Sequence, residues 1–180
     1  MRDLKEKFLK LLVRETHGAE IAEAAAVLPL MFMILLGIFW FGQAFSLYGA
    51  ITRAAQEGAR AGATPLCSTC SFTQNTTQNA ANAANAVQNA MIASNLDPNQ
   101  MQMSSPPAMN FCGNPVVQCP VTGAACVQVP VQLLTTAEGG GACGIAVTFQ
   151  YPFKFTLPFA SIGNQQILLT ASARMRMETR

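Results

Sequence analysis

Hydrophobic and polar positions divide the chain into an apolar first part and an alternating last part. Residues 24–52 carry no charged side chain, and residues 24–42 are almost wholly apolar. Because about 20 apolar residues in a helix cross the hydrocarbon core of a bilayer, this stretch predicts a membrane-spanning helix. Small and apolar residues continue at helical spacing as far as Ala63, so we expect one helix over 19–63, about 65–70 Å long, that projects beyond the bilayer.

The last part of the chain alternates apolar and polar residues with a period of two, which predicts half-buried strands. The three predicted strands are 127–133, 145–155 and 167–177. Pro130 has no backbone N–H, so the first of them is expected at a sheet edge or at a bulge. Glu138–Gly141 predicts the turn of a hairpin between the first two strands, and alternating Gln and Met predict a short fourth strand at 100–103.

A second helix is predicted over 75–95 by an apolar stripe of Ala80, Ala84, Val87 and Met91. Glycine and proline predict a loop over 104–123. An antiparallel sheet with one apolar face needs a cover, which the outer half of the long helix can supply. We therefore expect an α+β protein in which a long N-terminal transmembrane helix packs at its outer half on a small antiparallel sheet, with one extra helix and loops held by disulfides.

Charge limits the possible partners and suggests a topology. Only 11% of the 180 residues are charged and the net charge is +2, so no basic field points to nucleic acid. Five Lys and Arg residues precede the apolar segment, and only Arg53 and Arg60 follow it closely, which favours a cytoplasmic N-terminus. The alternative is a cleaved secretory signal with Gly42-Gln43-Ala44 as its site, but the apolar core is longer than such signals have.

All six cysteines follow the apolar segment: Cys67, Cys70, Cys112, Cys119, Cys126 and Cys143. This placement favours three structural disulfides in an oxidising compartment, in any of fifteen pairings. A redox pair of Cys67 and Cys70 is the first alternative, although the pair lies in a Ser/Thr loop after a helix. A zinc site is the second, although only one pair is close and His17 is the single histidine. We expect no metal, no cofactor, no catalytic constellation and hence no enzyme.

The segment before the apolar helix places Gly18 five residues before Glu23, after a basic leader. This arrangement resembles the processing site of type IV prepilins. The resemblance implies that a prepilin peptidase cuts between Gly18 and Ala19 on the cytoplasmic side. A carboxylate at the membrane edge of an apolar helix is costly unless it is paired. Glu23 of one subunit could therefore pair with the new α-amino group of Ala19 in its neighbour during assembly.

Residues 18–63 are similar to the N-terminal signature of TadE-like proteins. Three pieces carry the similarity: Val27-Leu28-Pro29 after Glu23, Gly37-Ile38 followed by Phe41-Gly42, and Ala54–Arg60. The resemblance implies a bacterial minor pilin or pseudopilin that helps to assemble or initiate a tight-adherence (Tad/Flp) pilus, a type IV pilus used in cell adhesion. The implied partners are other pilins and minor pilins, Tad inner-membrane assembly proteins, the prepilin peptidase and the lipid bilayer.

The expected organisation has three parts. Residues 1–18 form a cytoplasmic prepilin-like leader, 19–63 the long helix, and 64–180 an extracytoplasmic α+β domain. The protein would cross the inner membrane once, with this domain in the periplasm or outside the cell, or incorporated in a pilus. Two other functions stay open, namely an uncleaved membrane-anchored interaction module and a periplasmic thiol-redox protein.

Overall fold

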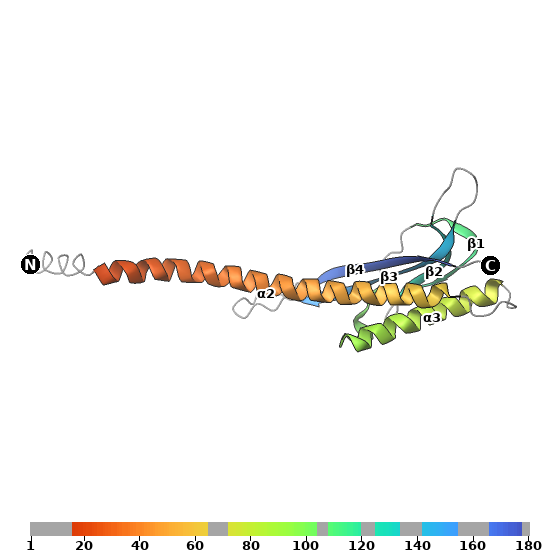
Figure 1. The fold of residues 1–180 in the computed structure, drawn as a ribbon, viewed down its shortest axis with the longest axis horizontal. Coiled ribbons are helices and arrows are strands. Elements are labelled where there is room, and N and C mark those ends of the chain that lie inside the picture. The colour runs from red at the N-terminus through yellow and green to blue at the C-terminus, as the bar shows by residue number, and fades with distance from the viewer. Residues whose placement is uncertain are drawn as a thin grey trace, which may run out of the picture. The chain divides into compact units, whose positions relative to one another are not determined.

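A computed structural model describes residues 16–64, 72–103, 108–119, 125–133, 142–154 and 166–177 (Figure 1). The elements are helices α2 (Thr16–Ala63) and α3 (Phe72–Ala93), the short 3-10 helix η1 (Pro98–Gln100), and strands β1 (Phe111–Gln118), β2 (Cys126–Gln132), β3 (Cys143–Lys154) and β4 (Gln166–Arg176). The chain divides into two compact units, Met1–Gln43 and Ala44–Arg180, so the last twenty residues of α2 belong to the second unit. The expected α+β class, with a long apolar N-terminal helix and an antiparallel sheet, is confirmed.

Both helices form where the apolar periodicity predicts them. On α3, Ala80, Val87 and Met91 are buried as expected, and Ala83 rather than Ala84 completes the stripe. The helix ends in a Schellman motif around Asn95, whose φ is 56°. There the Asn95 N–H donates to the Ile92 carbonyl (3.0 Å) and the Leu96 N–H to the Met91 carbonyl (2.9 Å). These bonds satisfy carbonyl groups that the last helical turn leaves open.

The four strands form one antiparallel sheet in the order β1-β2-β3-β4. The hairpin predicted from the two alternating segments is confirmed by the β2–β3 pairing, while the turn at Glu138–Gly141 lies outside the described residues. Two predictions are wrong. The segment predicted as a loop over 104–123 contains β1, and the strand predicted at 100–103 is reduced to a single bridge between Gln102 and Gln150, because η1 occupies Pro98–Gln100.

Pro130 lies in an interior strand, so its placement at a sheet edge is wrong and its placement at a bulge is confirmed. The β2–β3 register shifts between Gln128 and Val131, and the β1–β2 register shifts between Phe111 and Val116. An irregular stretch of ladder can accommodate a residue that has no N–H to donate. The proline is therefore compatible with β2 having a neighbour on each side.

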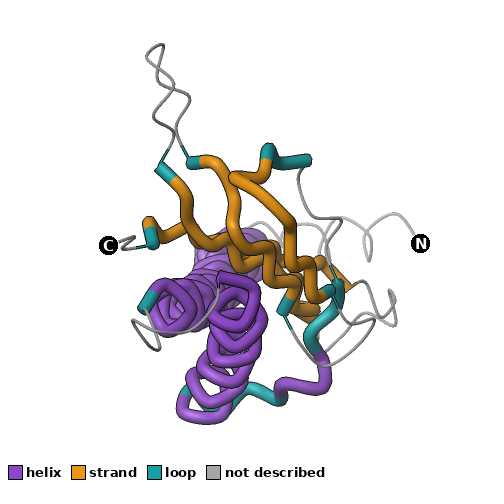
Figure 2. The backbone as a smooth tube through the Cα atoms, turned by 90° about the vertical axis from the view of Figure 1, so that its right-hand side faces the viewer, coloured by secondary structure: helices purple, strands orange, loops and turns teal. Residues whose placement is uncertain are grey.

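Both helices lie on the same side of the sheet (Figure 2). Small residues on α2 make the approach close, because a Cβ built at Gly58 or Gly62 would overlap side chains of α3 and β3. Gly62 meets Ile145 and Gly58 meets Val147. Two residues along a strand and four along a helix both advance about 6–7 Å, in opposite chain directions here. Residues 44–63 of α2 therefore run antiparallel to β3 and parallel to β4.

The second face of the sheet is less exposed than the alternating pattern suggested. Thr148 and Gln128 belong to the polar side of the alternating pattern, but they are only 4% and 6% exposed. Ala146, which lies opposite Gln128 on β3, is also buried. On α2, by contrast, Tyr48 lies at helical spacing from the buried Ile51 and Ala55 but is half exposed. The core thus runs from Ile51 to Ala63 on the helix and lies against α3 and the inner strands.

The close approach of α2 gives a matched pair of glycine substitutions. Gly62→Ala is expected to lower the free energy of unfolding by about 1–3 kcal/mol, because the added methyl meets the Ala83 methyl at 2.9 Å and the Asn79 carbonyl at 3.0 Å. Gly49→Ala places its methyl in open space on the same helix and should stabilise by about 0.5–1 kcal/mol. Urea unfolding of the full chain in detergent micelles checks both. Equal effects from the two substitutions would contradict this packing.

Candidate functional site

The N-terminal part of α2 exposes large apolar side chains on all sides. Leu28, Met33, Ile38 and Phe41 are all more than half exposed. Among the described residues this helix is the one long and apolar enough to cross a membrane, and the apolar window is not buried inside the chain. Each exposed methylene group loses about 0.8 kcal/mol relative to an apolar environment. This surface therefore requires lipid or other apolar helices around it.

The residues predicted for processing and assembly lie at the start of this helix. Gly18 and Ala19 are in the first turn of α2, which begins at Thr16, and Glu23 follows about 7 Å further along the axis. The side chain of Glu23 is exposed. Within the described part of the chain, no cationic group pairs with it. Its carboxylate is thus free for a partner outside these residues.

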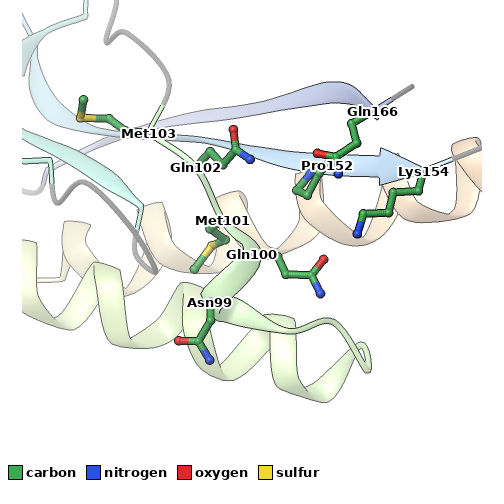
Figure 3. A pocket seen from close by; sticks show the side chains of 8 residues that line it. All are labelled: Asn99, Gln100, Met101, Gln102, Met103, Pro152, Lys154 and Gln166. Carbon is green, nitrogen blue, oxygen red and sulfur yellow. The ribbon is translucent and has the colours of Figure 1, made fainter. Parts of the chain in front are cut away.

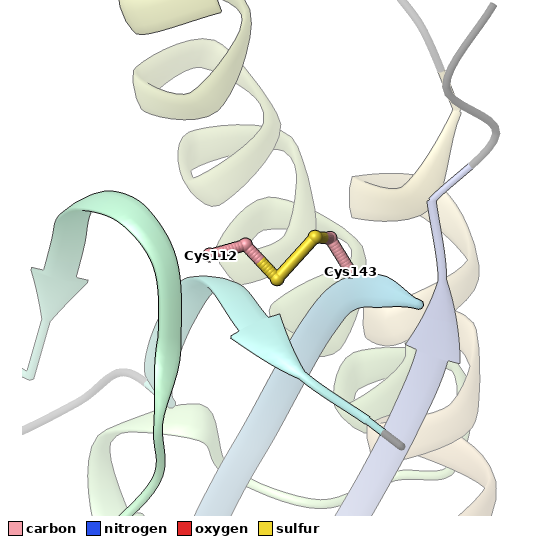
Figure 4. The surroundings of a disulfide bond; sticks show 2 residues. All are labelled: Cys112 and Cys143. Carbon is pink, nitrogen blue, oxygen red and sulfur yellow. A yellow bond between two sulfur atoms is a disulfide. The ribbon is translucent and has the colours of Figure 1, made fainter. Parts of the chain in front are cut away.

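Two disulfides join four of the six cysteines, whose pairing could not be assigned from the sequence. Cys112 on β1 is bonded to Cys143 at the start of β3, with a Cα–Cα distance of 6.0 Å (Figure 4). Cys119 is bonded to Cys126, with a Cα–Cα distance of 4.0 Å. The β1–β2 register explains this second pair, because Gln118 lies opposite Val127 and the next residues outward are the two cysteines. Cys67 and Cys70 lie outside the described residues.

A shallow cavity of about 660 Å³ is the candidate site for a small ligand (Figure 3). Lys154 and Gln166, which are opposite each other in the β3–β4 register, form one wall. η1 and the segment after it form the other wall, with Asn99, Gln100 and Gln102 as its polar side chains. The cavity therefore offers amide groups and one ammonium group.

Local hydrogen bonds explain how that second wall is held. Asp97 caps η1, and its Oδ1 accepts from the backbone N–H of Asn99 (3.0 Å) and from the Asn99 side chain (3.1 Å). The Gln102 N–H donates to the Gln150 carbonyl at 2.8 Å, which ties the segment to β3. Burial raises the pKa of the Tyr151 phenol above its ordinary value; a hydrogen bond with the Asp97 backbone opposes this rise, and the charge of the Asp97 carboxylate adds a smaller rise.

Groupings of side chains that hold metal ions are a further kind of candidate site. In the described ranges, no three His, Cys, Asp or Glu side chains come together in a way that could hold a metal ion. One N-terminal apolar helix, followed by a disulfide-bonded α+β unit, is consistent with a single-pass membrane anchor. The fold therefore defines a class of α+β proteins with a long apolar N-terminal helix and a small disulfide-bonded unit.

Comparison with known families makes this class more specific. Residues 18–60 match the family described as TadE-like protein. The match confirms the resemblance over these residues, which contain Gly18, Ala19 and Glu23, and it covers about a quarter of the chain. It points to a Tad pilus-related protein with partners in that pilus system. Searches of curated proteins and of solved structures found no match.

One further surface was not predicted from the sequence. The alternation over 167–177 correctly predicted the strand β4. It could not predict that β4 lies at an edge of the sheet, because the order of strands depends on long-range pairing. The structure places β4 at one end of the sheet, with a full-length edge.

Proposed function

We propose that this protein is a TadE-like minor pilin or pseudopilin that helps to assemble or initiate a tight-adherence pilus at the inner membrane. The match over residues 18–60 carries the proposal, because it joins the Gly18–Glu23 spacing to the exposed apolar helix. In this role the protein acts by packing and charge pairing rather than as an enzyme. The N-terminus lies in the cytoplasm, and the disulfide-bonded unit lies in the periplasm or in the pilus.

Glu23 supplies the register of assembly in this mechanism. Cleavage between Gly18 and Ala19 by a prepilin peptidase creates an α-amino cation close to the start of α2. An apolar helix surface gives little preference for one axial position over another, whereas a buried ion pair requires one geometry. The exposed carboxylate of Glu23 can form that pair with the Ala19 amine of a neighbouring pilin.

The test compares processing and piliation in cells that carry single substitutions. Gly18→Ala should leave the leader attached, so that intact mass and N-terminal sequencing give a chain that begins at Met1. Glu23→Ala should insert and be processed normally, but pilus number should fall at least tenfold. Glu57→Ala is the matched control, because Glu57 is an exposed carboxylate further along α2.

Three outcomes would contradict the proposal. A wild-type chain that keeps its Met1 terminus would favour an uncleaved membrane-anchored interaction module. Normal piliation in Glu23→Ala would remove the charge-pairing step even if cleavage occurs. A mature chain that begins near Phe45 would indicate a secreted protein, and the anchor itself would be wrong.

A further inference from the structure

The outer edge of β4 is long and regular. β4 is the last strand of the sheet, and it pairs with β3 without a register shift over eleven positions, from Gly144–Arg176 to Lys154–Gln166. Native proteins usually blunt such edges with bulges, prolines, charged side chains or short strands, because an open edge can pair with another chain. β4 has no proline, its edge is not shortened, and its charged residues, Arg174 and Arg176, lie together at its C-terminal end.

One hydrogen bond shows which backbone groups face outward. The Met177 N–H donates to the Cys143 carbonyl at 3.0 Å, so Met177 and every second residue before it direct their backbone groups toward β3. The residues between them direct their N–H and C=O groups away from the sheet. These residues are Gln166, Leu168, Thr170, Ser172, Arg174 and Arg176. In the described part of the chain, no group pairs with this row.

The opposite edge of the sheet is closed by contrast. The β1 register shifts between Phe111 and Val116, and Pro115 within this stretch has no N–H. Cys112 also ties β1 to β3. The sheet therefore has one edge suited to strand addition, and β1 of a second copy is poorly suited to fill it.

Direction disfavours a symmetric pairing of two β4 strands. Two copies joined antiparallel through β4 would be related by a twofold axis. Because β4 runs parallel to residues 44–63 of α2, the two Ala44 ends would then point in opposite directions. Each Ala44 is joined directly to an apolar segment that requires lipid or other apolar helices, and two such segments attached at opposite ends of the pair could not readily enter one bilayer. The occupant is therefore a different chain.

Charge indicates the chemistry of that chain. Arg174 and Arg176 are both exposed on the same face of β4, and none of the four strands carries an acidic residue. Residues directly opposite each other on neighbouring strands have side chains about 5 Å apart, so carboxylates are favoured there. We propose that the β4 edge binds, by strand addition, an extended segment of another protein that carries acidic residues at alternate positions opposite Arg174 and Arg176.

The probe is a fluorescein-labelled eleven-residue peptide that alternates valine with threonine and ends in two alternate glutamates. Binding to the full chain in detergent micelles is followed by fluorescence anisotropy, and hydrogen exchange locates the contact. We expect the six outward amides of β4 to become protected. The same peptide with alternate amides N-methylated should bind at least tenfold more weakly, as should a version with lysine in place of glutamate.

Matched variants separate backbone pairing from side-chain effects. Ser172→Pro removes one outward N–H and should weaken binding at least tenfold, whereas Ser172→Ala keeps that N–H and should bind as the wild type does. The pair Arg174→Gln and Arg176→Gln should weaken binding several-fold. If Ser172→Pro disturbs the sheet, seen as faster exchange of β2 and β3 amides, the N-methylated peptide still gives the decisive comparison.

Three results would overturn the inference. They are equal binding of the N-methylated and parent peptides, no binding of the acidic peptide at millimolar concentration, and concentration-dependent self-association that protects the same amides without peptide. The last would show that the occupant is a second copy. The inference goes beyond the proposed pilin role and does not depend on cleavage at Gly18, so each can fail without the other.

Discussion

Replacing Phe149 with alanine is expected to remove about 3–5 kcal/mol from the free energy of unfolding of the second unit. Phe149 is the largest fully buried side chain of the core, with 0% exposure. It lies opposite Ala171 on β4, and the helix–strand register brings it to the level of Ala54 on α2. These two neighbours are alanines, whose side chains cannot expand into the space that the ring would leave.

The cost is large because a cavity adds to the lost transfer free energy when the surroundings cannot collapse. Natural domains have only about 5–15 kcal/mol of stability, so this variant should be close to unfolding at ordinary temperature. Ile92→Ala is the control, because Ile92 lies on α3 with 60% exposure. It should change the free energy of unfolding by less than about 0.5 kcal/mol.

Urea titration of the full chain in micelles, followed by hydrogen exchange of the β3 amides, measures both variants. Exchange is needed because α2 contributes strong helical signal that reports on both units. A loss for Phe149→Ala no greater than that for Ile92→Ala would mean that Phe149 does not hold the sheet to the helices.

The elements that the sequence predicted share one property: their periodicity is continuous. α2 and α3 have uninterrupted apolar stripes, and β3 and β4 alternate without a break over eleven paired positions. Local pattern is sufficient in such segments, because each residue has the same relation to the core as the residue one period away. Their pairing as an antiparallel hairpin sheet with a helical cover then follows from burial alone.

β1 was missed because its pattern is interrupted at the point where its pairing is interrupted. Gly113 and Pro115 are typical of turns, and they lie within the register shift between Phe111 and Val116. Pairing with β2 and the bond from Cys112 to Cys143 hold the segment in the sheet. Neither long-range constraint can be read from the local sequence.

The candidate sites also divide into those set by local sequence and those set by long-range contacts. Gly18, Ala19 and Glu23 form a local motif, so their positions on α2 were available from spacing alone, and their roles stay a prediction. The disulfide partners were not available, because six cysteines permit fifteen pairings. The cavity beside Lys154 and the open edge of β4 exist only through strand order, and strand order is a long-range property.

The two disulfides should differ in their contribution to stability. Replacing Cys112 and Cys143 together with serine is expected to cost about 3.7 kcal/mol by the loop-entropy relation, because the bond spans 31 residues. The matched replacement of Cys119 and Cys126 releases a loop of only 7 residues and should cost about 2.4 kcal/mol.

The positions of the two disulfides in the sheet should widen the difference between their contributions to stability. Upstream of its register shift, β1 pairs with β2 at Phe111–Val131, and the bond at Cys112 is the next constraint on that stretch. Its loss should therefore free residues 110–114 as well as lower the global stability. The Cys119–Cys126 bond lies beside a regular ladder from Val116 to Gln118, which can hold the hairpin without it.

Urea unfolding gives the global cost of each double variant, and hydrogen exchange over residues 110–114 gives the local one. We expect both to be larger for the Cys112 and Cys143 replacement. If the replacement of Cys119 and Cys126 proved the more damaging, the hairpin would depend on its short covalent link. The bond across three strands would then contribute little to keeping β1 in the sheet.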